Sequence, residues 1–241
     1  MMENVTRWRH RAMHRAVMAL STRPALYYGA RAITGSLDHL CICRNTELVI
    51  EGYPRSANST TVHGFRERQE RSVRVAHHKH HAAQLIRAAQ WGIPAIALIR
   101  KPHETILSKL ALAEEGRRRT GRMGRGNAIT FDDAAKAWLT FYQAILPHED
   151  KLVVAPFERV TCDLEGVIED VNERFGTSFR SSPAVLTPQR ELGWHALPNP
   201  VRREVKVELE ETFQRMLSMR PRLDALIDRC DALYGRLIRP E

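Results

Sequence analysis

The chain has 241 residues, of which 43% are hydrophobic and 27% are charged, a composition typical of a folded globular protein rather than a disordered or membrane-embedded one. Its 37 Lys and Arg residues against 28 Asp and Glu residues leave a formal net charge of +9, which favours an anionic partner such as a nucleotide, a polyanionic substrate, a nucleic acid or a membrane surface. The longest apolar run, residues 92–99, is far shorter than the ~20 residues of a spanning helix, and the N-terminal residues do not have the pattern of a secretory signal. We therefore expect a cytoplasmic protein.

Residues 1–44 are expected to form a basic helical extension. Trp8, Met13, Val17 and Leu20 recur at helical spacing, arginines fill the other face, and Pro24 ends the pattern. We expect this extension to pack on the body of the protein. The alternative is a peripheral contact with a membrane surface.

Four short apolar runs are typical of buried strands in a parallel sheet, and segments with helical spacing follow them. The expected strands are residues 47–52, 72–76, 93–99 and 151–155, and the expected helices are 59–70, 81–91, 103–115 and 131–146. Strict alternation of strand and helix predicts an α/β fold with a doubly wound parallel sheet and helices on both faces.

The C-terminal part is expected to be mostly helical, over residues 163–175, 202–217 and 223–237, with an irregular Pro-rich stretch from 181 to 200. Residues 116–127 are rich in Gly and Arg, which predicts a mobile loop; the alternative is a lid or a surface that recruits an acceptor. No aromatic residues are interleaved with these arginines, so we expect no nucleic-acid partner.

The turn after the first expected strand carries the pattern of an anion-binding loop, because ligands bind at the carboxyl ends of strands in open parallel sheets. Its residues are Pro54, Arg55, Ser56, Ala57, Asn58, Ser59 and Thr60. Compared with the P-loop G-x-x-x-x-G-K-[ST], Gly52 and Ser59 are in place, but Ala57 replaces the second Gly and Asn58 replaces the Lys. Backbone N–H groups and the start of a helix can still bind a phosphate, whereas transfer from a magnesium-bound triphosphate is poorly supported.

A second anion-binding element follows the third expected strand. Arg100 stands at the strand end, Pro102 suits the first turn of a helix, and Ser108 lies two turns along that helix. A guanidinium and a hydroxyl in these places can converge on one phosphate group.

With these two elements the sequence resembles the sulfotransferase family, as a divergent member of the bacterial type. The family's 5′-phosphosulfate loop has the pattern Pro-[Lys/Arg]-Ser-Gly-Thr-Thr, and its 3′-phosphate element has Arg-x-Pro followed by a Ser eight residues after the Arg. The resemblance covers residues 46–180 and implies the P-loop type of nucleotide-binding fold. It also implies a donor, 3′-phosphoadenosine 5′-phosphosulfate (PAPS), and no metal. Residues 54–60 would then hold the phosphosulfate, with Arg55 stabilising the leaving phosphate, and Arg100 and Ser108 would hold the 3′-phosphate.

Between the two elements lies a cluster of four histidines and a lysine, residues 77–81, which we expect to face the same crevice. An acceptor hydroxyl must lose its proton, and His is the usual proton acceptor near pH 7. Aligning Gln84 with a glutamine that some sulfotransferases carry places His80 on the family's base, with His78 as the second candidate. A metal site and solvent-exposed loop histidines are the alternatives.

We therefore expect residues 1–44 to be an extension and residues 45–241 to be a sulfotransferase-like α/β domain. Its function would be sulfuryl transfer from PAPS to a hydroxyl or amine acceptor, with carbohydrates and small molecules as candidates. The alternatives are a P-loop nucleotide kinase or hydrolase and a non-enzymatic anion-binding module. The sequence has no late Arg-Lys-Gly loop of the kind many family members use for the 3′-phosphate, and Arg202 and Arg203 are candidate substitutes.

Overall fold

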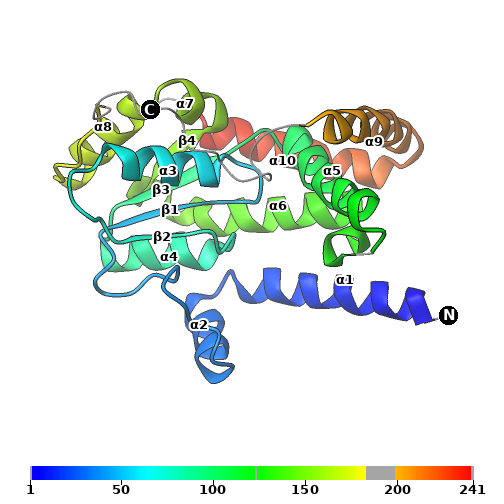
Figure 1. The fold of residues 1–241 in the computed structure, drawn as a ribbon, viewed down its shortest axis with the longest axis horizontal. Helices are drawn as coiled ribbons and strands as arrows, with labels where there is room; N and C mark the ends of the chain where they lie inside the picture. Colours follow the sequence, from blue (N-terminus) through cyan, green and yellow to red (C-terminus); the bar gives the residue numbers. More distant parts are fainter. Residues whose placement is uncertain (1, 123, 183–198, 240–241) are drawn as a thin grey trace.

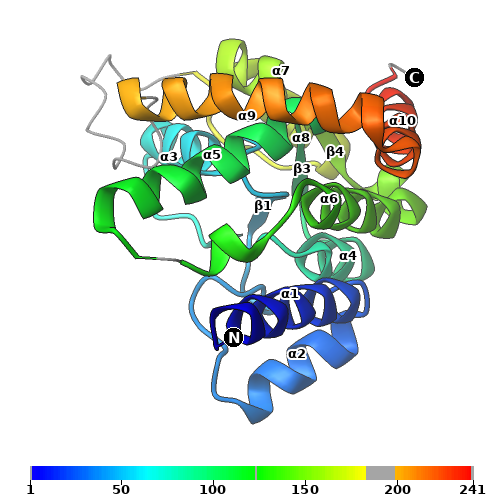
Figure 2. The same cartoon turned by 90° about the vertical axis from the view of Figure 1, so that its right-hand side faces the viewer.

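The structure, a computed structural model, describes residues 2–122, 124–182 and 199–239 (Figures 1 and 2). Its strands are β1 (Leu48–Gly52), β2 (Val75–His77), β3 (Ala95–Ile99) and β4 (Val153–Pro156). Its α-helices are α1 (Met2–Leu20), α2 (Pro24–Ile33), α3 (Asn58–Arg68), α4 (Ala82–Trp91), α5 (Pro102–Thr120), α6 (Phe131–Ile145), α7 (Phe157–Cys162), α8 (Leu164–Phe175), α9 (Pro200–Met219) and α10 (Pro221–Leu237). Two short 3-10 helices are η1 (Arg125–Ala128) and η2 (Leu146–Lys151).

The four strands form one parallel sheet in the order β2-β1-β3-β4, which confirms the α/β prediction. In the register of the central pair, Ile50 lies opposite Ile96 and Gly52 opposite Leu98. β2 begins three residues later than the sequence predicts and ends at His77, so its last residue belongs to the histidine cluster.

Alternate strand residues point to opposite faces, and each face has its own core. On one face Leu48, Ile50, Ile96 and Leu98 pack with α3 and α8. On the other face Val49, Ala95, Ala97 and Ile99 pack with α4, α6 and α10. Figure 1 shows α3 and α8 on one side of the sheet and α4 and α6 on the other.

Proline begins several of the helices, because the first helical turn does not need its missing N–H group. Pro24, Pro102, Pro200 and Pro221 all stand at helix starts. Pro24 therefore ends the first helical pattern as predicted but also begins a second helix, α2, within the N-terminal extension.

The expected mobile loop at residues 116–127 is wrong in its first part, where α5 continues to Thr120 and η1 follows. Glu114 pairs with Arg117 and Arg118 along the helix, and Arg118 also pairs with Glu208 of α9. These ion pairs offset the mutual repulsion of the neighbouring arginines, and the helix can therefore continue through them. Gly121, with φ of 66°, ends the helix in the left-handed conformation.

The N-terminal helices pack beside α4 and α6, as expected, and Tyr27 and Tyr28 of α2 share the core of that face. The C-terminal helices α9 and α10 follow, and α9 packs along α5 (Figure 2). Most of the Pro-rich stretch, residues 183–198, lies outside the described residues. No helix in the described part of the chain has the length and apolar character needed to cross a membrane.

Candidate functional site

A cavity of about 550 Å³ opens at the carboxyl ends of β1 and β3, between the starts of α3 and α5 and the helices α7 and α9. Its lining contains most of the residues that the sequence predicts for the two anion-binding elements, together with the two histidines predicted as candidate bases. They are Pro54, Arg55, Ala57, Asn58, Ser59, Thr60, Arg100 and Ser108 of the anion-binding elements, and His78 and His80. Ser56 is the exception, because its side chain is fully buried and lies 3.4 Å from the hydroxyl of Tyr142.

The loop after β1 owes its shape to a close approach and two left-handed residues. Gly52 passes so near β3 that a Cβ atom there would lie 2.4 Å from the carbonyl oxygen of Leu98. Arg55 and Ala57 have φ values of 77° and 69°, in the region that favours glycine. The side-chain amide of Asn58 donates to the carbonyl of Tyr53 (3.2 Å) and closes the loop.

The first turn of α3 presents its backbone N–H groups without a side-chain cap. Its N-cap residue, Ala57, has no oxygen to accept from them. Uncapped N–H groups and the positive end of the helix dipole are suited to an anion. Because residues 57–60 line the cavity, this helix end borders the same space as Arg55 of the loop and Arg100 at the end of β3.

Arg55 and Arg100 reach the cavity from different strands and have different partners from those expected. Nε of Arg55 donates to Oγ of Ser108 (3.0 Å), whereas Arg100 pairs with Glu104 (2.8 Å). The guanidinium of Arg100 also lies 4.0 Å from the ring centroid of Phe157 and donates to the carbonyl of Arg55 (3.4 Å). Ser108 is thus bonded to the loop arginine, although both residues of the predicted Arg100–Ser108 pair do line one cavity.

Cationic groups crowd this space. Burial, followed by the charges of Arg202 and Arg100, lowers the pKa of Arg55 to about 10. Arg203 and Lys206 of α9 line the same cavity. A concave site with several cations raises the local concentration of anions and stabilises them when they bind.

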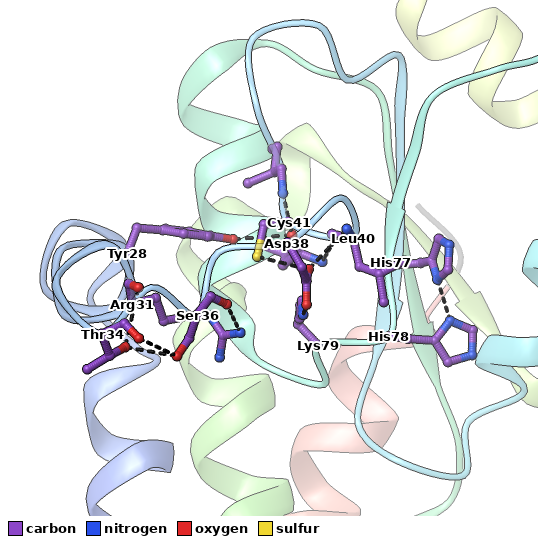
Figure 3. Close-up of polar contacts among 12 residues, drawn as sticks. Tyr28, Arg31, Thr34, Ser36, Asp38, Leu40, Cys41, His77, His78 and Lys79 are labelled. Atoms are coloured by element: carbon purple, nitrogen blue, oxygen red, sulfur yellow. Dashed lines mark hydrogen bonds and ion pairs between the residues drawn. The ribbon is translucent and has the colours of Figure 1, made fainter.

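The expectation that the whole histidine cluster faces the crevice is wrong, because the chain turns sharply through it. His78 and His80 have φ values of 56° and 55° and line the cavity. His77 is buried against Arg66, and His81 packs against the ring of Tyr27. Lys79 turns away to pair with Asp38, as Figure 3 shows.

His80 has the geometry of a proton acceptor. Its Nδ1 donates to the carbonyl of Gly52 (3.0 Å) and lies 3.5 Å from Oε1 of Glu51. Since a carbonyl only accepts, the proton belongs on Nδ1 and the lone pair on Nε2. Burial lowers the pKa of His80, so the ring is neutral near pH 7.

His78 is less available, because both of its ring nitrogens have partners. Nε2 lies 2.9 Å from Oγ of Ser59, and Nδ1 lies 2.5 Å from Nδ1 of His77. Burial and the neighbouring His80 lower its pKa as well. His78 therefore supports the loop through Ser59, and its ring lacks the spare acceptor that His80 has.

Glu51 is not among the site residues predicted from the sequence, and it lies fully buried behind His80. Its carboxylate accepts from the backbone N–H groups of Gly52 and Lys79 and from the amide of Gln84. Burial raises the pKa of Glu51. The sequence does contain a signal for this residue, because Glu51 is a lone carboxylate at the end of an apolar strand. A buried carboxylate needs hydrogen-bond donors around it.

Lys206 is the second omission, and no sequence signal could have placed it. It belongs to α9, about 150 residues from the loop in the chain. Arg202, one turn earlier, is buried and paired with Glu115 of α5, which anchors α9 over the cavity. Arg202 and Arg203 were candidates for a late phosphate element, and both line the cavity.

In comparisons with known proteins, no protein-family model, curated protein or solved structure matches the chain. The geometry of the cavity is therefore the basis for inferring a function.

Proposed function

We propose that the protein is a sulfotransferase of the P-loop type that moves a sulfuryl group from PAPS to a hydroxyl or amine acceptor. The observation that carries the proposal is the composition of one cavity. An uncapped helix start, the loop arginine Arg55, the strand-end arginine Arg100 and a histidine with its Nε2 lone pair available all border it.

This lining has the chemistry that the donor requires. PAPS carries two separated anionic groups, a 5′-phosphosulfate and a 3′-phosphate. The loop of residues 54–60 with the start of α3 supplies one anion-binding element, and Arg100 with Ser108 supplies the other. Arg203 and Lys206 add cations from α9 in place of the family's late loop.

In the proposed reaction the acceptor oxygen or nitrogen attacks sulfur, and the bond between sulfur and the 5′-phosphate oxygen breaks. His80 takes the acceptor's proton on Nε2, while Gly52 and Glu51 hold its Nδ1 side. The negative charge that develops on the leaving 5′-phosphate is stabilised by Arg55 and by the N–H groups of α3. The products are the sulfated acceptor and 3′-phosphoadenosine 5′-phosphate.

Calorimetric titration with 3′-phosphoadenosine 5′-phosphate tests the proposal directly. We expect micromolar binding by the parent protein and by Lys101→Ala, whose side chain is exposed next to the site. Arg100→Ala should bind roughly tenfold more weakly or worse, because it loses a charge-assisted contact. His80→Asn should keep this binding while losing turnover of PAPS.

ATP with magnesium is the control ligand, and its binding in place of the sulfotransferase product would favour a nucleotide kinase or hydrolase. Binding of neither ligand would favour an anion-binding module. If Arg100→Ala bound as tightly as Lys101→Ala, the assignment of Arg100 would be wrong.

A further inference from the structure

Helix α1 packs on the domain through one side and leaves large apolar side chains exposed elsewhere. Met18 is buried in the core, and Arg11 and Arg15 pair with Asp133, a carboxylate whose side chain is only 1% exposed. Trp8, 70% exposed, and Met13, 66% exposed, lie outside this packing. A helix that only packed on the domain would carry polar residues on its exposed surface.

Helix α2 also buries one side against the domain and exposes apolar side chains on the other. Pro24, Tyr27 and Tyr28 are buried, whereas Leu26 and Ile33 are exposed, Ile33 by 89%. Five of the nine large hydrophobic side chains that are exposed in the described part of the chain lie within its first 37 residues. Exposed apolar residues that are scattered singly need no explanation, whereas five in one short segment do.

The charge around this surface has one sign. The first 37 residues contain six arginines and a single acidic residue, Glu3. Of the arginines, Arg9, Arg15 and Arg23 are exposed on or beside the two helices. Figures 1 and 2 show α1 and α2 together at one side of the molecule, beyond α4, where a large partner can reach them.

We propose that the outward faces of α1 and α2 form a docking surface for an anionic lipid bilayer. Exposed apolar side chains, among them a tryptophan, flanked by arginines are the pattern of helices that lie in the membrane interface. The negative surface of a bilayer complements these arginines. A second copy of the chain fits less well, because a two-fold interface would bring six arginines from each copy together with one acidic residue from each. The inference is independent of the sulfotransferase proposal.

Vesicle flotation with the full chain tests the surface, using phosphatidylcholine alone and an equal mixture with phosphatidylglycerol. The parent protein should bind the anionic vesicles, release them at high salt, and bind the neutral ones weakly. Met13→Ser with Ile33→Ser should reduce binding roughly tenfold, because less apolar surface enters the interface. The matched control is Val207→Ser with Met219→Ser, two exposed residues of α9, which should bind like the parent.

A charge-reversal pair gives a second, independent arm. Arg9→Glu with Arg23→Glu should reduce binding to anionic vesicles at least roughly tenfold, since each arginine near the surface contributes attraction. Arg222→Glu with Arg229→Glu, exposed on α10, is its control with equal net charge. If both double variants lost vesicle binding equally, the overall positive charge of the protein would explain the binding, and the proposal would be overturned. Absence of vesicle binding, or a dimer in sedimentation that Met13→Ser with Ile33→Ser dissociates, would overturn it too.

Discussion

Four residues of the candidate site hold backbone conformations that side chains disfavour. Arg55, Ala57, His78 and His80 have positive φ, and all four line the cavity. The left-handed region costs an L-residue roughly 1–2 kcal/mol, and such strain concentrates at functional sites. At Arg55, His78 and His80 the left-handed conformation directs a polar side chain into the cavity. At Ala57 the side chain is a methyl group, so the strain serves no side-chain contact.

Ala57→Gly should therefore stabilise the fold. Relief of the left-handed strain outweighs the added flexibility of glycine in the unfolded chain, and we expect a gain of about 0.5 kcal/mol in the free energy of unfolding. Urea denaturation measures it. Ala225→Gly, at an exposed position inside α10, should instead lose about 1 kcal/mol. Similar losses in both variants would show that Ala57 is not strained.

At the scale of elements, one buried carboxylate links two helices. Asp133 completes the capping box at the start of α6, with its carboxylate accepting from the backbone and hydroxyl of Thr130. The same carboxylate accepts from Arg11 and Arg15. Although burial opposes it, the hydrogen bonds from Thr130 and the two arginines hold the pKa of Asp133 well below its usual range. Asp133 thus ties α1 to the start of α6.

Asp133→Asn should loosen α1 while leaving α6 capped, because asparagine keeps an acceptor for the cap but not the charge. We expect faster tryptic cleavage at Arg9, Arg11 and Arg15, and a loss of about 2 kcal/mol in the free energy of unfolding. The control is Asp132→Asn, which removes the neighbouring carboxylate that pairs with Arg220. Cleavage no faster than in this control would mean that apolar packing alone holds α1.

At the scale of the whole molecule, histidines kept neutral by burial make stability depend on pH. Burial lowers the pKa of His77 and of His81 to about 3 and that of His14 to about 4, from 6.5. Below pH 6.5 the unfolded chain binds protons at these residues that the folded protein does not. Their contribution is therefore fully present above pH 6.5 and declines as the pH falls.

The free energy of unfolding should fall by at most about 3 kcal/mol between pH 6.5 and pH 5.5, because each of the three histidines contributes no more than about 1 kcal/mol over this interval. Urea denaturation at both values measures it. His77→Gln should reduce this difference, whereas His148→Gln, on the partly exposed η2, should not. A stability unchanged at pH 5.5 would show that these histidines protonate in the folded state without cost.

The sequence predicts the candidate site best where its residues are local in the chain. The loop after β1 and the Arg100–Ser108 element each lie within about ten residues, so their positions follow from where a strand ends and a helix starts. The bonding between them does not follow. Arg55 and Ser108 are 53 residues apart, and only packing brings their side chains to 3.0 Å.

By itself the sequence determined the alternation of strands and helices, and with it the parallel sheet and the edge at which the cavity lies. Those features depend on the period of apolar residues and on local turn chemistry. The tertiary structure decided which histidines reach the cavity, that Glu51 lies behind His80, that α9 adds Arg203 and Lys206, and that Arg11 of α1 pairs with Asp133. These arrangements depend on contacts between side chains from different elements, and a buried charge such as Asp133 finds its partners only when the elements pack together.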